Sequence, residues 1–115
     1  MAGPVPPGEL RFAFDAGSGT VLWGPADLAA LPLSDGLRAE LASLAAQYDE
    51  SLNWDYPPDP GPWREARCAR FNADARDALE RVRAELGQEV EDGFVELHED
   101  PDLDRYLADP KGFER

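Results

Sequence analysis

Three prolines, Pro57, Pro58 and Pro60, separate two amphipathic segments and thereby constrain the whole chain. A proline has no backbone N–H and its ring clashes with the preceding turn, so no helix continues through this stretch. Apolar residues recur at helical spacing on both sides of the break. The pattern therefore predicts two helices that lie antiparallel, joined by a stiffened loop.

Local signals place the limits of both helices. Ser34 is a good N-cap for the first helix. The second is predicted to run from near Pro62 to Leu86, with Gly87 as the residue that ends it. The buried stripes consist of Leu37, Leu41, Leu44, Ala45 and Tyr48 in the first helix, and of Cys68, Phe71, Ala75, Leu79, Val82 and Leu86 in the second. The solvated face of the second helix carries the i, i+4 pairs Arg70–Asp74, Arg76–Glu80, Asp77–Arg81 and Arg81–Glu85.

Three segments read as strands. Residues 10–14 alternate with Leu10, Phe12 and Phe14 on one face, as a half-buried strand does. A turn at 15–19 and a returning strand at 20–24 complete a hairpin. Residues 89–97 form the third candidate, with a bulge at Gly93. The fold class is therefore α+β: a two-layer sandwich in which a small antiparallel sheet, made of the hairpin plus the C-terminal strand, is covered by two helices.

A chain of 115 residues has room for a single domain. Residues 1–9 are rich in proline and glycine and are predicted to be a disordered N-terminal segment. Residues 10–98 form the single α+β domain, whose connector carries one helical turn at 25–30. Residues 99–115 form an acidic C-terminal tail with a short helix, which Asp100 caps and in which Pro101 is the first residue.

The charge balance limits the partners. There are 24 Asp and Glu residues against 11 Lys and Arg, which gives a net charge of −13. Such a surface repels nucleic-acid phosphates and anionic membranes, so neither is an expected partner. The N-terminus lacks the features of a signal peptide, and the one cysteine fits a reducing compartment. We therefore expect a cytoplasmic protein, whose oligomeric state the sequence leaves open.

The segment from residue 53 to 63 is the most distinctive in the chain. Rigid aromatic side chains lose little entropy on binding, and carboxylates lie between them. The predicted partner-binding residues are Trp54, Asp55, Tyr56, Asp59 and Trp63. In the alternative interpretation, the two tryptophans staple the loop over the core. Both hold if one ring is buried while another is presented to a partner.

No combination of residues predicts catalysis, a metal site or a cofactor. Cys68 lies on the buried stripe, where a thiol is inert. His98 is the only histidine, and it is expected at the surface. The acidic run 99–104 lacks the Gly and Glu that a calcium loop needs. Asp55 and Asp59 could pair as acid and base, but nothing sets their separation.

Residues 14–20, Phe-Asp-Ala-Gly-Ser-Gly-Thr, resemble the first phosphate-binding loop of the actin, sugar-kinase and chaperone ATPase superfamily. That resemblance implies a nucleotide site. However, the superfamily needs two domains and further motifs, which this length excludes. A plain hairpin turn accounts for the same residues, and we expect no nucleotide to bind.

A second resemblance covers residues 10–97. The quoted segments are Leu31–Gly36, Tyr48–Asp55, Pro62–Trp63 and Arg70–Asn72. They are similar to small uncharacterised acidic proteins of GC-rich Gram-positive bacteria, a group with no assigned activity. The resemblance therefore implies no catalytic residues.

Together these features predict a non-catalytic acidic protein-binding module, immunity-like or inhibitor-like, that masks a basic protein partner. The alternative is a small ligand-binding protein or enzyme with a pocket between the aromatic loop and the sheet.

Overall fold

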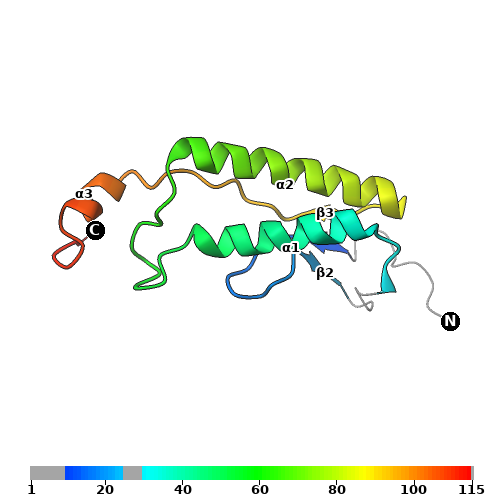
Figure 1. The fold of residues 1–115 in the computed structure, drawn as a ribbon, viewed down its shortest axis with the longest axis horizontal. Helices are drawn as coiled ribbons and strands as arrows, with labels where there is room; N and C mark the ends of the chain where they lie inside the picture. Colours follow the sequence, from blue (N-terminus) through cyan, green and yellow to red (C-terminus); the bar gives the residue numbers. More distant parts are fainter. Residues whose placement is uncertain (1–9, 25–29, 115) are drawn as a thin grey trace.

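The computed structural model describes residues 10–24 and 30–114. The predicted disordered segment 1–9 and most of the predicted helical turn at 25–30 lie outside the described residues. The molecule is elongated, with principal extents of 57 × 23 × 22 Å. Figure 1 shows two long helices side by side, a small sheet against one half of them, and a short helix at the opposite end.

The elements follow the order β1, β2, α1, α2, β3 and α3. Their bounds are β1 Arg11–Phe12, β2 Leu22–Trp23, α1 Asp35–Glu50, α2 Glu65–Leu86, β3 Glu91–Asp92 and α3 Leu103–Ala108. The α+β class and the antiparallel helix pair are confirmed.

Both long helices use the predicted end signals. The Ser34 hydroxyl accepts a hydrogen bond from the Leu37 amide at 3.2 Å, which satisfies one free N–H of the first turn of α1. Gly87 ends α2 in the left-handed conformation at a φ of 63°, which glycine adopts without the steric penalty of a side chain. The predicted stripes face each other and, with β1, β2 and Val90, form the core.

The sheet has the order β2-β1-β3 and is mixed. The hairpin pair is antiparallel as predicted, but β3 runs parallel to β1, so the predicted fully antiparallel sheet is wrong for its third strand. Figure 1 shows the reason: α2 ends at the end of the molecule where β1 begins, so the chain that returns from Gly87 enters β3 in the direction of β1.

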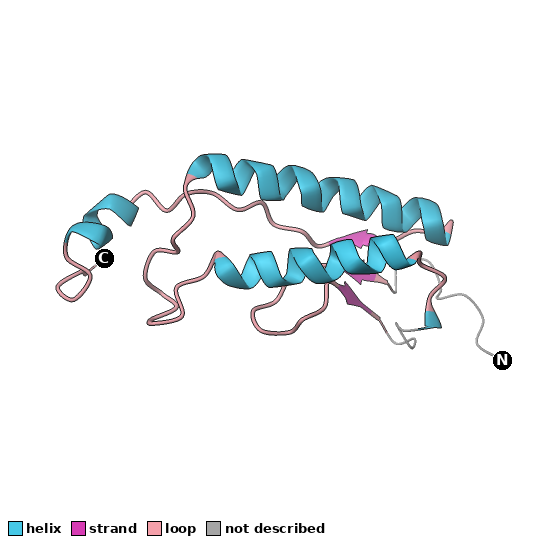
Figure 2. Ribbon diagram, in the orientation of Figure 1, coloured by secondary structure: helices cyan, strands magenta, loops and turns pink. Residues whose placement is uncertain are grey.

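Each strand is shorter than predicted, because side chains satisfy backbone groups that a longer ladder would have used. The Trp23 indole N–H donates to the Ala13 carbonyl at 2.9 Å. The buried amide of Asn72, on α2, donates to the Leu97 carbonyl and accepts from the Leu97 N–H, both at 2.8 Å. Residues after β3 therefore run along α2 as an extended segment rather than as a strand (Figure 2).

The C-terminal helix starts two residues later than predicted. The Asp100 carboxylate accepts the Asp102 N–H at 2.8 Å in a turn that precedes α3, and the helix itself begins at Leu103. Leu103 is buried, and Asp104 forms an ion pair with Arg64 at 2.8 Å. These contacts hold α3 at the end of the molecule opposite the sheet.

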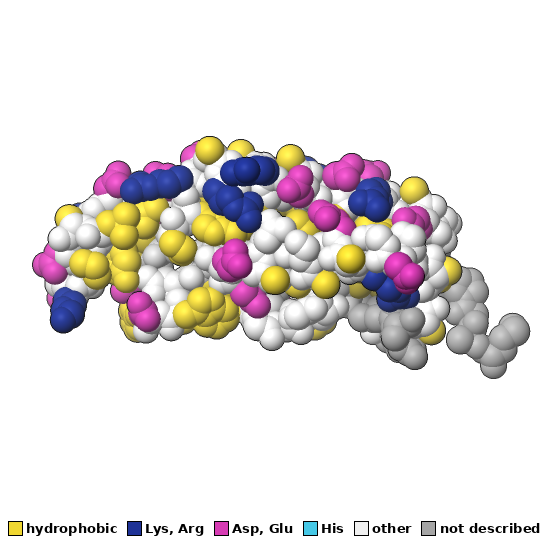
Figure 3. Space-filling view, in the orientation of Figure 1, with side chains coloured by type: hydrophobic (Ala, Val, Ile, Leu, Met, Phe, Trp, Pro, Cys, Tyr) yellow, Lys and Arg dark blue, Asp and Glu magenta, His cyan; other side chains and the backbone are white. Residues whose placement is uncertain are grey.

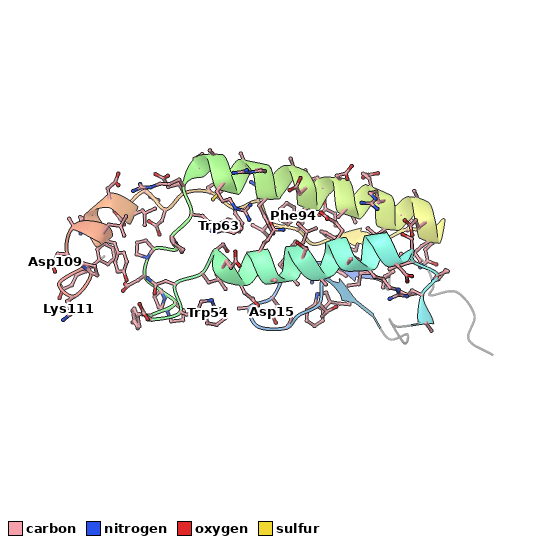
Figure 4. All side chains as sticks on the ribbon, in the orientation of Figure 1. Asp15, Trp54, Trp63, Phe94, Asp109 and Lys111 are labelled. Atoms are coloured by element: carbon pink, nitrogen blue, oxygen red, sulfur yellow. The ribbon has the colours of Figure 1, made fainter. Side chains whose placement is uncertain are left out.

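Six aromatic rings extend the core beyond the short sheet. Phe14 lies at their centre, with ring centroids 5.2–5.6 Å from those of Phe12, Tyr48, Phe71 and Phe94. Trp63 joins the cluster through Phe71, at 5.5 Å. Figure 4 shows Trp63 and Phe94 between the two long helices.

Two glutamates connect the helix ends to distant segments. Glu85, near the end of α2, accepts the Ser34 amide at 2.6 Å and its hydroxyl at 2.9 Å. Glu65 and Glu99 form reciprocal hydrogen bonds. The Glu99 carboxylate accepts the Glu65 N–H at 3.1 Å, and the Glu65 carboxylate accepts the Glu99 N–H at 2.8 Å. Glu99 thus caps α2, whose N-cap residue Arg64 makes no side-chain capping bond.

Acid should lower the stability of this protein, and Glu85 should contribute. The bonds from the Ser34 amide and hydroxyl hold the pKa of Glu85 below its usual value. The unfolded chain therefore takes up this proton first as the pH falls, so stability present above about pH 5 decreases below it. We expect Glu85→Gln to flatten the fall in melting temperature between roughly pH 7 and pH 3. Glu40→Gln should keep the wild-type slope, and an unchanged slope in Glu85→Gln would contradict the prediction.

Candidate protein-binding surface

Asn53 organises the loop that joins α1 to α2. Its side-chain oxygen accepts the N–H groups of Asp55 and Tyr56, both at 3.1 Å, and its amide donates to the Pro60 carbonyl at 3.1 Å. Asn53 itself is buried. One side chain therefore fixes both sides of the loop and sets the direction in which its tip projects.

The base of the loop is closed by backbone packing. A Cβ atom on Gly61 would lie 2.1 Å from the carbonyl oxygen of Ser51, so only glycine allows the two ends of the loop to approach this closely. Pro60 is fully buried beneath them. The loop is therefore packed against itself in a defined conformation, as the three prolines predict.

The aromatic residues of the loop divide into two groups. Trp63 packs on the core, with the Arg67 guanidinium 4.0 Å above its ring. Trp54 and Tyr56 are each 58% exposed, although the Trp54 indole N–H donates to the Asp49 carbonyl at 2.7 Å. Figure 4 places Trp54 outside the helix pair. Trp63 therefore packs on the core as the stapling interpretation predicts for one ring, whereas Trp54 and Tyr56 are exposed.

Arg64, the N-cap residue of α2, and Arg76 within the helix form ion pairs with the C-terminal segment. Arg76 pairs with Glu96 at 3.2 Å and Asp92 at 3.9 Å, and Arg64 pairs with Asp104 and Glu99. The predicted Arg76–Glu80 pair is wrong, because Glu80 pairs with Arg83 at 2.9 Å instead. The segment after β3 lies alongside α2, so these longer-range pairs replace contacts within the helix. Figure 3 shows acidic and basic side chains interleaved over α2.

The loop and the end of α1 have no such compensation. Between Arg38 and Arg64 the sequence contains five acidic residues and no Lys, Arg or His. In the described ranges, neither Asp55 nor Asp59 is paired with a cationic side chain. The predicted site thus combines exposed aromatic rings with uncompensated negative charge. We call Trp54, Asp55, Tyr56 and Asp59, with Trp63 at their base, the aromatic acidic loop.

A known protein family matches most of this chain. Residues 10–96 match the family described as Serratia CdiI immunity protein-like. The chain belongs to this immunity-protein-like family. No curated protein matches the chain significantly. Membership confirms the predicted class of function, a non-catalytic protein-binding module of the immunity or inhibitor type.

The turn of the hairpin in this immunity-like protein reaches Asp49 near the end of α1, the residue whose carbonyl also accepts the Trp54 indole N–H. The Gly17 N–H donates to the Asp49 carboxylate at 2.9 Å. Gly17 and Gly19 have φ values of 73° and 71°, as a turn rich in glycine predicts. The Gly17 amide, which a phosphate loop would direct at its ligand, is thus already bonded to a carboxylate. This contact favours the plain hairpin over the nucleotide site.

Among the described residues, none from the aromatic acidic loop lines the recesses beside the sheet, so the predicted pocket between the loop and the sheet is not seen there. The strands lie at one end of the helix pair and the loop lies at the other (Figure 2). Much of α1 separates them, and this helix of 16 residues is about 24 Å long at the helical rise per residue. The groove beside the loop faces α3 instead. One wall consists of loop residues, among them Trp54, Asp55 and Pro60. The other wall consists of the α3 residues Leu103, Tyr106 and Leu107.

The remaining chemical candidates behave as surface or core residues. Cys68 is 2% exposed, and burial raises the pKa of its thiol, so the reactive thiolate is disfavoured. His98 is exposed, with Nδ1 3.0 Å from the Glu65 carboxylate. Within residues 10–24 and 30–114, no group of three or more His, Cys, Asp or Glu side chains could hold a metal ion. No helix of the described segments has the length and apolar character to cross a membrane.

Neither Asn53 nor α3 was predicted from the sequence to be part of this surface. An Asn that precedes a proline-rich turn is a known signal for a side chain that bonds the backbone two residues on, so Asn53 could have been found. The side on which α3 docks carries no local signal, since it depends on the path of residues 93–102 along α2.

Proposed function

We propose that this protein is an immunity protein that binds a toxin protein and masks it through the aromatic acidic loop. The observation that carries the proposal is the pairing of two exposed aromatic rings, Trp54 and Tyr56, with carboxylates that no cation of the described chain neutralises. Rings of this kind anchor interfaces, and complementary charge speeds and orients the encounter. The family to which the chain belongs supplies the immunity role.

The toxin is proposed to present a basic face, and the complex to form in the bacterial cytoplasm. The net charge of −13 supports a basic partner, and the single buried thiol fits a reducing compartment. The composition, with Lys111 as the only lysine and no isoleucine, supports a source with a GC-rich genome, as in the Gram-positive group of the second resemblance.

Capture from a lysate of the native host tests the proposal. The immobilised wild-type protein should retain one basic protein at low salt and release most of it at high salt, because screening weakens charge pairing. That protein should arrest growth when expressed alone and lose its toxicity when this chain is co-expressed. Trp54→Ala and Tyr56→Ala should each weaken binding by about 2 kcal/mol, or roughly 30-fold.

Val95→Ala is the matched control. Val95 is 79% exposed but lies on the segment after β3, away from the loop, so its truncation should leave the affinity unchanged. Equal binding by wild type and both loop variants would refute the assignment of the surface. A captured protein without toxicity would refute the immunity role.

A further inference from the structure

A groove lies between the aromatic acidic loop and α3, beside the proposed binding surface. Its volume is about 290 Å³, at the lower limit of small-molecule pockets, so it suits a side chain better than a metabolite. Figure 3 shows hydrophobic side chains gathered at this end of the molecule, where the loop and α3 meet. The walls are apolar, apart from a few polar groups that limit what can enter.

The polar groups of this groove favour a cation. Asp55 contributes a carboxylate without a cationic partner in the described chain, while the Asn53 side chain already bonds three backbone groups inside the loop. Trp54 and Tyr106 contribute aromatic rings, and rings attract cations over their faces. Leu107, 54% exposed at the α3 side, offers apolar surface to an aliphatic stem.

We propose that this groove receives an arginine side chain of the toxin, an inference that rests on the proposed function. The guanidinium pairs with the Asp55 carboxylate and stacks on an aromatic ring, while its aliphatic stem covers Leu107. Arginine fits better than lysine, because the planar guanidinium can stack and can bond a carboxylate through two N–H groups at once.

The wall formed by α3 lies outside the family match. That match ends at residue 96, whereas α3 spans Leu103–Ala108. The groove therefore combines a loop inside the family region with a helix beyond it.

The test uses the whole protein and needs no toxin. N-acetyl-arginine amide is titrated into the ¹⁵N-labelled chain, with N-acetyl-lysine amide and the uncharged N-acetyl-citrulline amide as comparators. We expect weak binding by the arginine amide, with shifts confined to the Trp54 indole N–H and the backbone amides of Asp55, Tyr106 and Leu107. The lysine amide should bind at least about threefold more weakly, and the citrulline amide more weakly still.

Two variants probe the two walls. Asp55→Asn removes the carboxylate, and Leu107→Lys places a cation on α3; each should weaken binding of the arginine amide about fivefold. Asp77→Asn removes one negative charge from the exposed face of α2 and should leave binding unchanged. Unfolding curves should show that all three variants are folded, since every substituted side chain is exposed.

Several outcomes would overturn the inference. Shifts scattered over the acidic surface would show non-specific attraction, and equal affinity for the lysine amide would remove the arginine assignment. Concentration-dependent shifts without any amide would show that a second copy fills the groove. Toxin capture without binding of the arginine amide at the groove would leave the proposed function standing and refute this inference. Binding of the arginine amide at the groove with no toxin captured would refute the proposed function and, with it, the assignment of the arginine to a toxin.

Discussion

Trp63→Ala should lower the free energy of unfolding by about 3 kcal/mol, whereas Trp54→Ala and Tyr56→Ala should each cost less than about 1 kcal/mol. Trp63 packs on Phe71 with ring centroids 5.5 Å apart and carries the Arg67 guanidinium on its other side. Removing the indole leaves a cavity beneath the loop and loses both contacts. The expected loss is at the lower end of the range for Trp because the side chain is only partly buried.

Urea unfolding of the three variants, followed by circular dichroism, measures the difference. Trp54 and Tyr56 serve as matched controls, since they belong to the same loop and are mostly exposed. If Trp63→Ala unfolds at the same urea concentration as Trp54→Ala, the loop is not fastened through its second tryptophan. In that case the distinction between Trp63, which packs on the core, and the exposed rings of Trp54 and Tyr56 does not govern stability.

Asn72→Leu should cost about 2–3 kcal/mol and release the segment that carries α3. The Asn72 amide makes both hydrogen bonds to the backbone of Leu97, and it is buried in α2. Leucine has a similar size but can bond neither group, so the backbone of Leu97 loses both partners in a dry environment. Asn72→Asp should be nearly as harmful, because a carboxylate cannot donate to the Leu97 carbonyl.

Hydrogen exchange gives a local readout of this effect. Protection of the Leu97 amide, and of amides in α3, should fall far more than protection in α1. Asp74→Ala, on the exposed face of the same helix, should change neither stability nor exchange. Undiminished protection at Leu97 in Asn72→Leu would show that packing alone holds the segment.

The loss of α3 would also affect binding. One wall of the groove beside the aromatic acidic loop comes from α3. Asn72→Leu should therefore weaken binding of the arginine amide in the same titration. Structural and functional effects of Asn72 are therefore linked through one extended segment, residues 93–102.

The sequence determined those features that depend on neighbouring residues. The spacing of apolar residues predicted the buried stripes of the two helices. Ser34 marked the start of the first helix and Gly87 the end of the second, and the prolines predicted a stiff loop between them. Alternation placed Leu10, Phe12 and Phe14 on the core side of β1. Composition predicted an acidic binding module. These signals act within a few residues, so they can be read without knowing the fold.

Tertiary structure alone decided the features that join distant segments. The direction of β3 depends on where α2 ends, the cap of α2 comes from Glu99, and the partner of the Asn72 amide lies 25 residues away. The charges follow the same rule, since acids of the C-terminal segment pair with Arg64 and Arg76, while Asp55 and Asp59 of the loop have no cationic partner in the described chain. A carboxylate or an amide can bond many groups, and only the packing of helices and segments determines which of them it meets.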